Sequence, residues 1–254
     1  MSTHDEGWNP GRPAEMATGA TVESAPLLGI LMLNTRFPRI PGDIGNPSTF
    51  SFPVRYEVVE PALVKRIVNP AMPPPGVIDA FAAAAARLEA AGVRALATSC
   101  GFLALLQHEL GRRCRVPLLS SSLLQVAMVA AGLPAGRRVG VLTFNSQALT
   151  PAHLQAAGAP PDTPVVGIEN GRELFRVIWQ DLPELDPKAA EDDVLKAGEK
   201  LLARAPEVGA IVLECTNMAP YARALAACIG LPVFDVVSLL EWWCGGLLPR
   251  NFAT

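Results

Sequence analysis

One pattern occurs twice in this chain of 254 residues and constrains the fold more than any other feature. An apolar run at residues 93–97 leads to Cys100, and a second run at residues 210–213 leads to Cys215. Short apolar runs of this kind are typical of buried strands, and a helical pattern follows each cysteine directly. The sequence therefore predicts two thiols at equivalent places, each at the end of a strand and the start of a helix.

The spacing of the flanking segments indicates a duplication. Pro117 follows Cys100 by 17 residues, and Pro232 follows Cys215 by the same number. The distance from a glycine in an earlier apolar run to the cysteine is 71 residues in the first half and 75 in the second. Two copies of one strand–helix–strand unit, related by a pseudo-twofold axis, would bring both cysteine turns to one cleft.

Apolar runs that alternate with helical patterns predict an α/β fold with parallel pairing through right-handed crossovers. The expected strands cover residues 27–33, 54–59, 93–97, 116–119, 138–144, 210–213 and 231–235. The expected helices cover residues 77–91, 102–111, 123–131, 149–157, 173–180, 188–204 and 219–228, with a last one from residue 238. We expect two pseudo-symmetric, doubly wound parallel-sheet lobes with the active site in the cleft between them.

The domain organisation follows from this pattern. Residues 1–24 are polar and show no apolar period, so we expect a disordered leader there. The N-terminal α/β lobe should span residues 25–133, and its closing helix could come from the C-terminal end of the chain. The C-terminal α/β lobe should span residues 134–254.

Composition excludes several classes of partner. The formal net charge is −3 and the basic residues are scattered, so we expect no nucleic-acid partner. The apolar run at residues 25–33 is much shorter than the roughly 20 residues of a membrane span, and no basic leader precedes it. We therefore expect no membrane partner and a soluble, cytoplasmic protein.

The cysteines and histidines indicate neither a disulfide framework nor a metal site. Five cysteines are an odd number, none forms a C-x-x-C pair, and the three histidines have no ligand spacing. Phosphate-binding motifs of the G-x-G-x-x-G and Walker types are also absent. We expect free thiols, no metal and no cofactor.

The position of the two thiols suggests their chemistry. At a helix N-terminus, unpaired backbone N–H groups and the helix dipole favour thiolate over thiol, so we expect Cys100 and Cys215 to be catalytic. One thiolate would remove the proton α to a carboxylate, and the opposite thiol would return a proton to the other face. Neighbouring groups would stabilise the charge that develops on the carboxylate.

A small carboxylate substrate needs polar groups around the two thiols. The residues that we expect to bind it are Asn34, Arg36, Asp43, Asn46, Ser99, Gly101, Thr143, Asn145, Thr216 and Asn217. Arg39 lies in a long loop at residues 37–50, and Arg36 directly precedes this loop. Either arginine could hold a carboxylate or be solvated. We expect the loop to cover the site, since loops this long in a compact domain are often functional.

Three other features have structural interpretations beside functional ones. Asp235 ends a predicted strand at the site edge, and it could equally cap the next helix. His108 is expected on a helix surface rather than as a base. Trp242 and Trp243 are expected to pack a lobe or a dimer surface, and we expect a homo-oligomer, most simply a homodimer.

The two turns also resemble those of a known family. The segments at residues 97–102 (ATSCGF) and 213–218 (LECTNM), in two α/β halves, are similar to the cysteine turns of the aspartate/glutamate/hydantoin racemase superfamily. The resemblance covers about residues 26–243. It implies cofactor-independent proton transfer, with Cys100 and Cys215 matching the two catalytic cysteines and a cleft between two lobes.

The resemblance implies less about the substrate. Amino-acid racemases of this group commonly have Cys-Asn-Thr at the first turn and Cys-Thr-His or Cys-Thr-Glu at the second. Here Gly101 and Phe102 follow the first cysteine, and Thr216 and Asn217 follow the second. Phe102 should make the pocket more apolar than that of an amino-acid racemase.

Three functions stay open at this point. The first is a racemase or epimerase that acts at the carbon α to a carboxylate and uses both thiols. The alternative is a lyase of the same superfamily, which cleaves dimethylsulfoniopropionate by β-elimination or decarboxylates a malonate with one cysteine as base. A non-catalytic two-lobed binding protein is the third, although such a protein has no need of a thiol at the same edge of each lobe.

Overall fold

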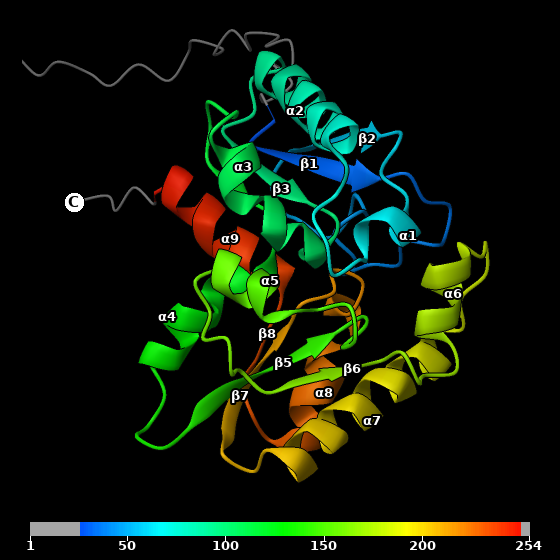
Figure 1. Cartoon of the computed structure of the whole chain (residues 1–254), viewed down its shortest axis with the longest axis vertical. Coiled ribbons are helices and arrows are strands. Elements are labelled where there is room, and N and C mark those ends of the chain that lie inside the picture. Colours follow the sequence, from blue (N-terminus) through cyan, green and yellow to red (C-terminus); the bar gives the residue numbers. More distant parts are fainter. Residues whose placement is uncertain (1–25, 250–254) are drawn as a thin grey trace, which may run out of the picture.

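The computed structural model describes residues 26–249, so the leader expected at residues 1–24 lies outside the described part of the chain. Two parallel sheets of four strands each organise this part (Figure 1). The first has the order β2-β1-β3-β4, formed by β1 (Leu28–Leu33), β2 (Val54–Val59), β3 (Ala95–Thr98) and β4 (Leu118–Leu119). The second has the order β6-β5-β7-β8, formed by β5 (Arg138–Thr143), β6 (Val165–Gly167), β7 (Val208–Leu213) and β8 (Val233–Phe234).

The two sheets have the same strand order, which confirms the predicted α/β fold of two related lobes. All pairings between neighbouring strands are parallel. Every residue of β1 is buried, as expected for a central strand covered on both faces. The continuous apolar runs that predicted strands in the sequence reflect this two-sided burial.

Helices connect the strands in both lobes. The first lobe contains α1 (Val64–Ile67), α2 (Pro75–Ala90), η1 (Gly101–Leu106), α3 (Gln107–Gly111), η2 (Ser122–Gln125) and α4 (Val126–Ala131). The second contains α5 (Pro151–Ala156), α6 (Leu174–Gln180), α7 (Pro187–Arg204), η3 (Ala219–Tyr221), α8 (Ala222–Ile229) and α9 (Val236–Leu247). Here η denotes a 3₁₀ helix. Among residues 26–249, no helix is long and apolar enough to cross a bilayer.

The helices differ from the prediction mainly where they follow the cysteine turns. The helix expected over residues 102–111 begins as the 3₁₀ helix η1, and the one expected from residue 219 begins as η3. Helix α9 begins at Val236 rather than at residue 238, because the Asp235 side chain accepts a hydrogen bond from the Ser238 N–H and caps it. Asp235 is therefore a helix cap, which is one of the two roles expected for it.

Helix α9 follows the last strand of the second sheet but packs on the first. Its buried residues Val236, Leu239 and Leu240 share an apolar cluster with Leu28 and Ile30 of β1. Figure 1 shows this helix, in red, lying beside the upper lobe. The C-terminal end of the chain thus supplies a helix to the sheet formed by the N-terminal half.

The loop between β1 and β2 (residues 34–53), called the β1–β2 loop below, reaches the other lobe. Its Arg36 forms an ion pair with Asp181, whose carboxylate also accepts the Arg36 and Phe37 N–H groups. Gly42 has a φ of +94°, and a Cβ there would lie 3.0 Å from the Cα of Pro220 in η3. The loop is therefore held against the second lobe at two points.

Candidate active site

The two cysteine turns meet at the boundary between the sheets. Cys100 follows β3, and Cys215 follows β7, which is the equivalent strand of the other sheet. The hydroxyl of Thr216 donates to the Ser99 carbonyl at 2.8 Å and so ties one turn directly to the other. The carboxyl ends of the parallel strands are where ligands bind in open α/β sheets.

A small pocket lies at these turns. Its walls are largely apolar, and its polar groups are few and close to the thiols. The lining residues are Leu33, Phe37, Arg39, Val64, Val68, Ser99, Cys100, Gly101, Phe102, Phe144, Ile178, Glu214, Cys215, Thr216 and Asn217. An apolar cavity with a few convergent polar groups is the usual form of a small-molecule site.

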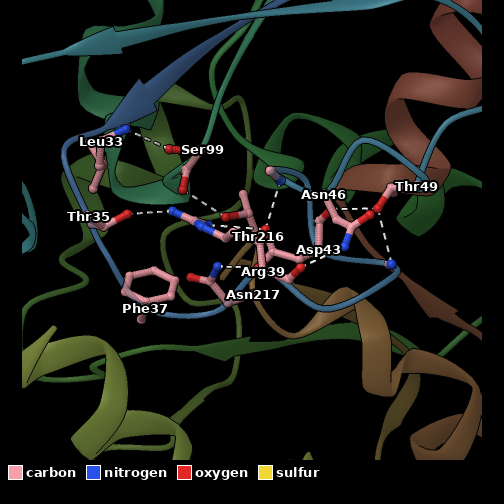
Figure 2. Close-up of polar contacts among 12 residues, drawn as sticks. Leu33, Thr35, Phe37, Arg39, Asp43, Asn46, Thr49, Ser99, Thr216 and Asn217 are labelled. Carbon is pink, nitrogen blue, oxygen red and sulfur yellow. Dashed lines mark hydrogen bonds and ion pairs between the residues drawn. The ribbon is translucent and has the colours of Figure 1, made fainter. Parts of the chain in front are cut away.

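The β1–β2 loop supplies an ion pair between Arg39, which lines the pocket, and Asp43. Figure 2 shows the polar contacts of both residues. Arg39 donates to Asp43 at 3.1 Å and to Thr35 at 2.8 Å, and its guanidinium lies 4.2 Å from the centre of the Phe37 ring. The Asp43 carboxylate also accepts the Asn217 amide N–H at 2.6 Å. The loop is thus bonded to the turn that carries Cys215.

Glu214 is fully buried beneath the two turns. One carboxyl oxygen, Oε2, accepts the Thr143 hydroxyl at 2.7 Å and the Phe144 N–H at 3.3 Å. The other oxygen, Oε1, has no hydrogen-bond partner within residues 26–249. Burial raises the pKa of this carboxyl to about 7 despite the two hydrogen bonds.

The environment of the thiols differs from the expectation. We predicted that helix N-termini would favour thiolates, but burial raises the pKa of both Cys100 and Cys215 well above that of a free thiol. Glu214 raises both further, whereas the Phe102 and Asn217 N–H groups lower them only in part. The prediction was wrong because desolvation outweighs the short 3₁₀ helix and turn that follow the thiols.

The two thiols are also not equivalent. Cys215 is 7% exposed and donates to the Asn217 side-chain oxygen at 3.6 Å, and the nearby Asp43 raises its pKa. Cys100 is partly exposed, and the nearby Arg39 lowers its pKa. The two thiols therefore have different electrostatic surroundings, although the fold is pseudo-symmetric.

The structure brings together half of the residues predicted for the site. The predicted residues that line the pocket are Cys100, Cys215, Ser99, Gly101, Thr216 and Asn217. The predicted residues that are not among its lining are Asn34, Arg36, Asp43, Asn46, Thr143 and Asn145. The roles of both sets in catalysis and substrate binding remain predictions.

The residues away from the pocket lining have structural contacts instead. Asn34 donates to Glu60, and Arg36, whose side chain is 80% exposed, pairs with Asp181. Asn145 accepts the Gln147 N–H within its own turn. These three side chains are occupied away from the pocket.

The other three support groups that do line it. Asn46 donates to the Arg39 carbonyl, Asp43 holds the Arg39 side chain and Asn217, and Thr143 donates to Glu214. They contact the pocket lining through these hydrogen bonds.

Glu214 is the main group to which the sequence analysis assigned no role. Its signal is present in the sequence, since a charged residue there directly follows the apolar run at residues 210–213 and directly precedes Cys215. Its burial, however, depends on the opposite turn.

Among the described residues, no group of three or more histidine, cysteine, aspartate or glutamate side chains is arranged to hold a metal ion.

A family model described as Asp/Glu/hydantoin racemase matches residues 57–242, which is most of the chain. The chain belongs to this family. The match includes both cysteine turns and confirms the resemblance drawn from their sequences.

Curated relatives with a named activity are dimethylsulfoniopropionate lyases. The chain is 27% identical over 228 residues to the one from Durusdinium sp. clade D, covering 87% of this chain and 75% of the relative. It is 28% identical over 256 residues to lyase 7 of Emiliania huxleyi, covering 96% and 74%. It is also 28% identical to lyase 5 of Emiliania huxleyi, of which it spans only 45% of the length.

Solved structures share the fold at low identity. Unliganded arylmalonate decarboxylase superposes with a TM-score of 0.55 at 14% identity, covering 89% of this chain and 94% of that one. Glutamate racemase from Francisella tularensis in complex with D-glutamate superposes with a TM-score of 0.51 at 13% identity, covering 91% and 85%. These similarities support the two-lobed architecture.

Proposed function

We propose that this protein is a cofactor-independent lyase that removes the proton α to the carboxylate of a small acid and expels a leaving group from the β-carbon. Dimethylsulfoniopropionate is the substrate that we propose to test first. The curated relatives described above carry that activity in their names and align with 86% to 96% of this chain. They favour the lyase alternative of the sequence analysis over the racemase.

The observation that carries the proposal is the composition of the pocket. Two thiols are among the lining residues, and most of the others are aliphatic or aromatic. Apart from Glu214 beneath the turns, no carboxylate is among the lining residues to hold an α-ammonium group. Such a pocket suits an acid that lacks an α-amino group.

The two ends of a sulfonium acid have different requirements. Arg39 uses two of its donors on Asp43 and Thr35, and the guanidinium has five, so further N–H groups remain for a substrate carboxylate. A methylated cation is attracted to aromatic faces, as quaternary ammonium ligands are. Phe102 and Phe144 line the same pocket and supply such surfaces.

The reaction then needs one base. A thiolate of one turn takes the proton from the α-carbon, the C–H electron pair forms the C=C bond, and the β-carbon–sulfur pair leaves with dimethyl sulfide. The products are acrylate, dimethyl sulfide and a protonated thiol. Backbone N–H groups of the turns would stabilise the charge that develops on the carboxylate.

The test is the incubation of the purified full chain with dimethylsulfoniopropionate. Dimethyl sulfide is measured by gas chromatography and acrylate by proton NMR. We expect both products in equal amounts, with no added metal or cofactor. No release above that of a heat-treated sample would contradict the proposal.

The second candidate is a racemase or epimerase. It is favoured by the retention of two thiols at equivalent turns, because inversion needs a group on each face of the carbon. A racemase would remove the optical rotation of a chiral acid while leaving its composition intact, whereas a lyase would produce an unsaturated acid. The two functions are thus separated by the product alone.

A further inference from the structure

Glu214 lies in contact with both cysteine turns. It directly precedes Cys215 in the chain, and its carboxyl packs under Gly101, which directly follows Cys100. A Cβ at Gly101 would clash with Glu214 Oε1 and with the Glu214 carbonyl oxygen. Only a glycine fits at this position, so the first turn is shaped around the carboxyl of the second.

The carboxyl is bonded on one side only. Oε2 accepts from Thr143 and Phe144, while the buried Oε1 has no partner in the described part of the chain. A buried carboxylate with one bare oxygen is costly, because desolvation of the charge is not fully offset. The neutral acid, with its proton on Oε1, avoids much of this cost.

The charge of Glu214 also acts on the thiols. An ionised Glu214 raises the pKa of both Cys100 and Cys215, so the three groups compete for negative charge. Two like charges in a buried site repel far more strongly than they would in water. A thiolate can therefore form much more readily beside a neutral Glu214 than beside an ionised one.

We propose that Glu214 is a positioning residue that must be uncharged when Cys100 or Cys215 becomes a thiolate, so that the carboxyl and a thiol are never ionised together. In each turnover the thiol gives its proton to solvent while Glu214 keeps its own. This inference rests on the proposed function only for its effect on turnover, since the thiols titrate in the free protein as well.

Other titratable groups near the pocket do not provide the change of charge that Glu214 provides. Arg39 and Asp43, from the β1–β2 loop, form an ion pair with each other and change the local charge little as a pair. His153, on the helix α5 that packs against η1, contacts the Phe102 ring, and burial lowers the pKa of this imidazole to about 4. It is therefore neutral above that pH, and Glu214 is the group whose charge changes near pH 7.

The test is the rate of thiol alkylation in the absence of substrate. The wild-type protein and Glu214→Gln are treated with iodoacetamide between pH 6 and pH 9.5, and the labelling of each cysteine is followed by mass spectrometry. The glutamine keeps an acceptor for Thr143 and Phe144 but has no charge. We expect Cys100 and Cys215 to react about tenfold faster at pH 8.5 in the variant, because more thiolate is present.

Two controls make the comparison specific. The exposed Cys228 should react equally in both proteins and calibrates the reagent. The variant Glu169→Gln removes a carboxylate that accepts from the Ser146 N–H and hydroxyl in the same lobe but is not among the pocket lining. It should leave the alkylation of Cys100 and Cys215 unchanged.

A second variant covers the case in which Glu214→Gln does not fold. Thr143→Val removes the hydroxyl that stabilises the carboxylate, so Glu214 should stay neutral to higher pH and alkylation should be faster between pH 7 and pH 8. Unchanged or slower alkylation of both pocket thiols in a folded variant would overturn the proposal. Faster alkylation in the variants, together with no release of dimethyl sulfide by the wild-type protein, would leave this proposal standing and overturn the lyase assignment instead.

Discussion

At the scale of single residues, the site depends on one glycine. Gly101 lies against the carbonyl and the carboxyl of Glu214 and leaves no space for a Cβ. We expect Gly101→Ala to lower the free energy of unfolding by about 1–3 kcal/mol, since the neighbouring backbone would have to move. Displacement of the adjacent Cys100 should lower kcat/KM by about a hundredfold.

Denaturant unfolding and steady-state kinetics check this prediction. The matched control is Gly111→Ala in α3, where nothing lies within 4 Å of the added Cβ. Its free energy of unfolding should change by no more than about 1 kcal/mol, and its activity should be unchanged. Equal effects of the two substitutions would show that the contact with Glu214 has no special importance.

The sequence could predict the two thiols because their signal is local. A strand, a cysteine and a helix start are consecutive in the chain at both Cys100 and Cys215. The role of Glu214 could not be predicted in the same way, because its burial depends on Gly101, more than a hundred residues earlier. The raised thiol pKa values have the same origin, since desolvation is a property of the assembled pocket.

At the scale of elements, the sequence predicted most strands and helices, including the two-residue strands β4 and β8, and missed β6 and α1. Strand β6 has three residues and helix α1 has four, too few for an apolar period to show, whereas β4 and β8 belong to longer runs that were predicted as strands. The β1–β2 loop was expected to cover the site. The structure places its Phe37 and Arg39 in the pocket wall, while Arg36 points to Asp181 instead.

Helix α9 is the element that joins the end of the chain to the first sheet. Leu240 of this helix is fully buried in the cluster that it shares with β1. We expect Leu240→Ala to lower the free energy of unfolding by about 2–5 kcal/mol, because it leaves a cavity in that cluster. Leu248, which is 53% exposed just after the helix, provides the control.

Chemical denaturation measures both variants. Leu248→Ala should change the free energy of unfolding by less than about 0.5 kcal/mol, as is usual for surface positions. A small effect of Leu240→Ala, similar to that of the control, would mean that α9 contributes little to the stability of the first lobe.

At the scale of the whole molecule, two sheets with one strand order face each other through their cysteine turns. The hydrogen bond from Thr216 to the Ser99 carbonyl and the one from Asn217 to Asp43 cross between the halves at the pocket. Each half supplies one thiol, so neither half forms the site alone. The duplication was visible in the sequence spacing, whereas the contacts that join the copies were not.

The central claim is that the pocket thiols perform the proton transfer. Its most direct test is the rate of dimethyl sulfide release by Cys100→Ser, Cys215→Ser and the exposed control Cys228→Ser, each compared with the wild type at equal thermal stability. We predict that at least one pocket variant loses about 10²- to 10⁴-fold in kcat/KM, as expected for loss of a general base, and that Cys228→Ser keeps the wild-type value. Wild-type rates in both pocket variants would contradict the account.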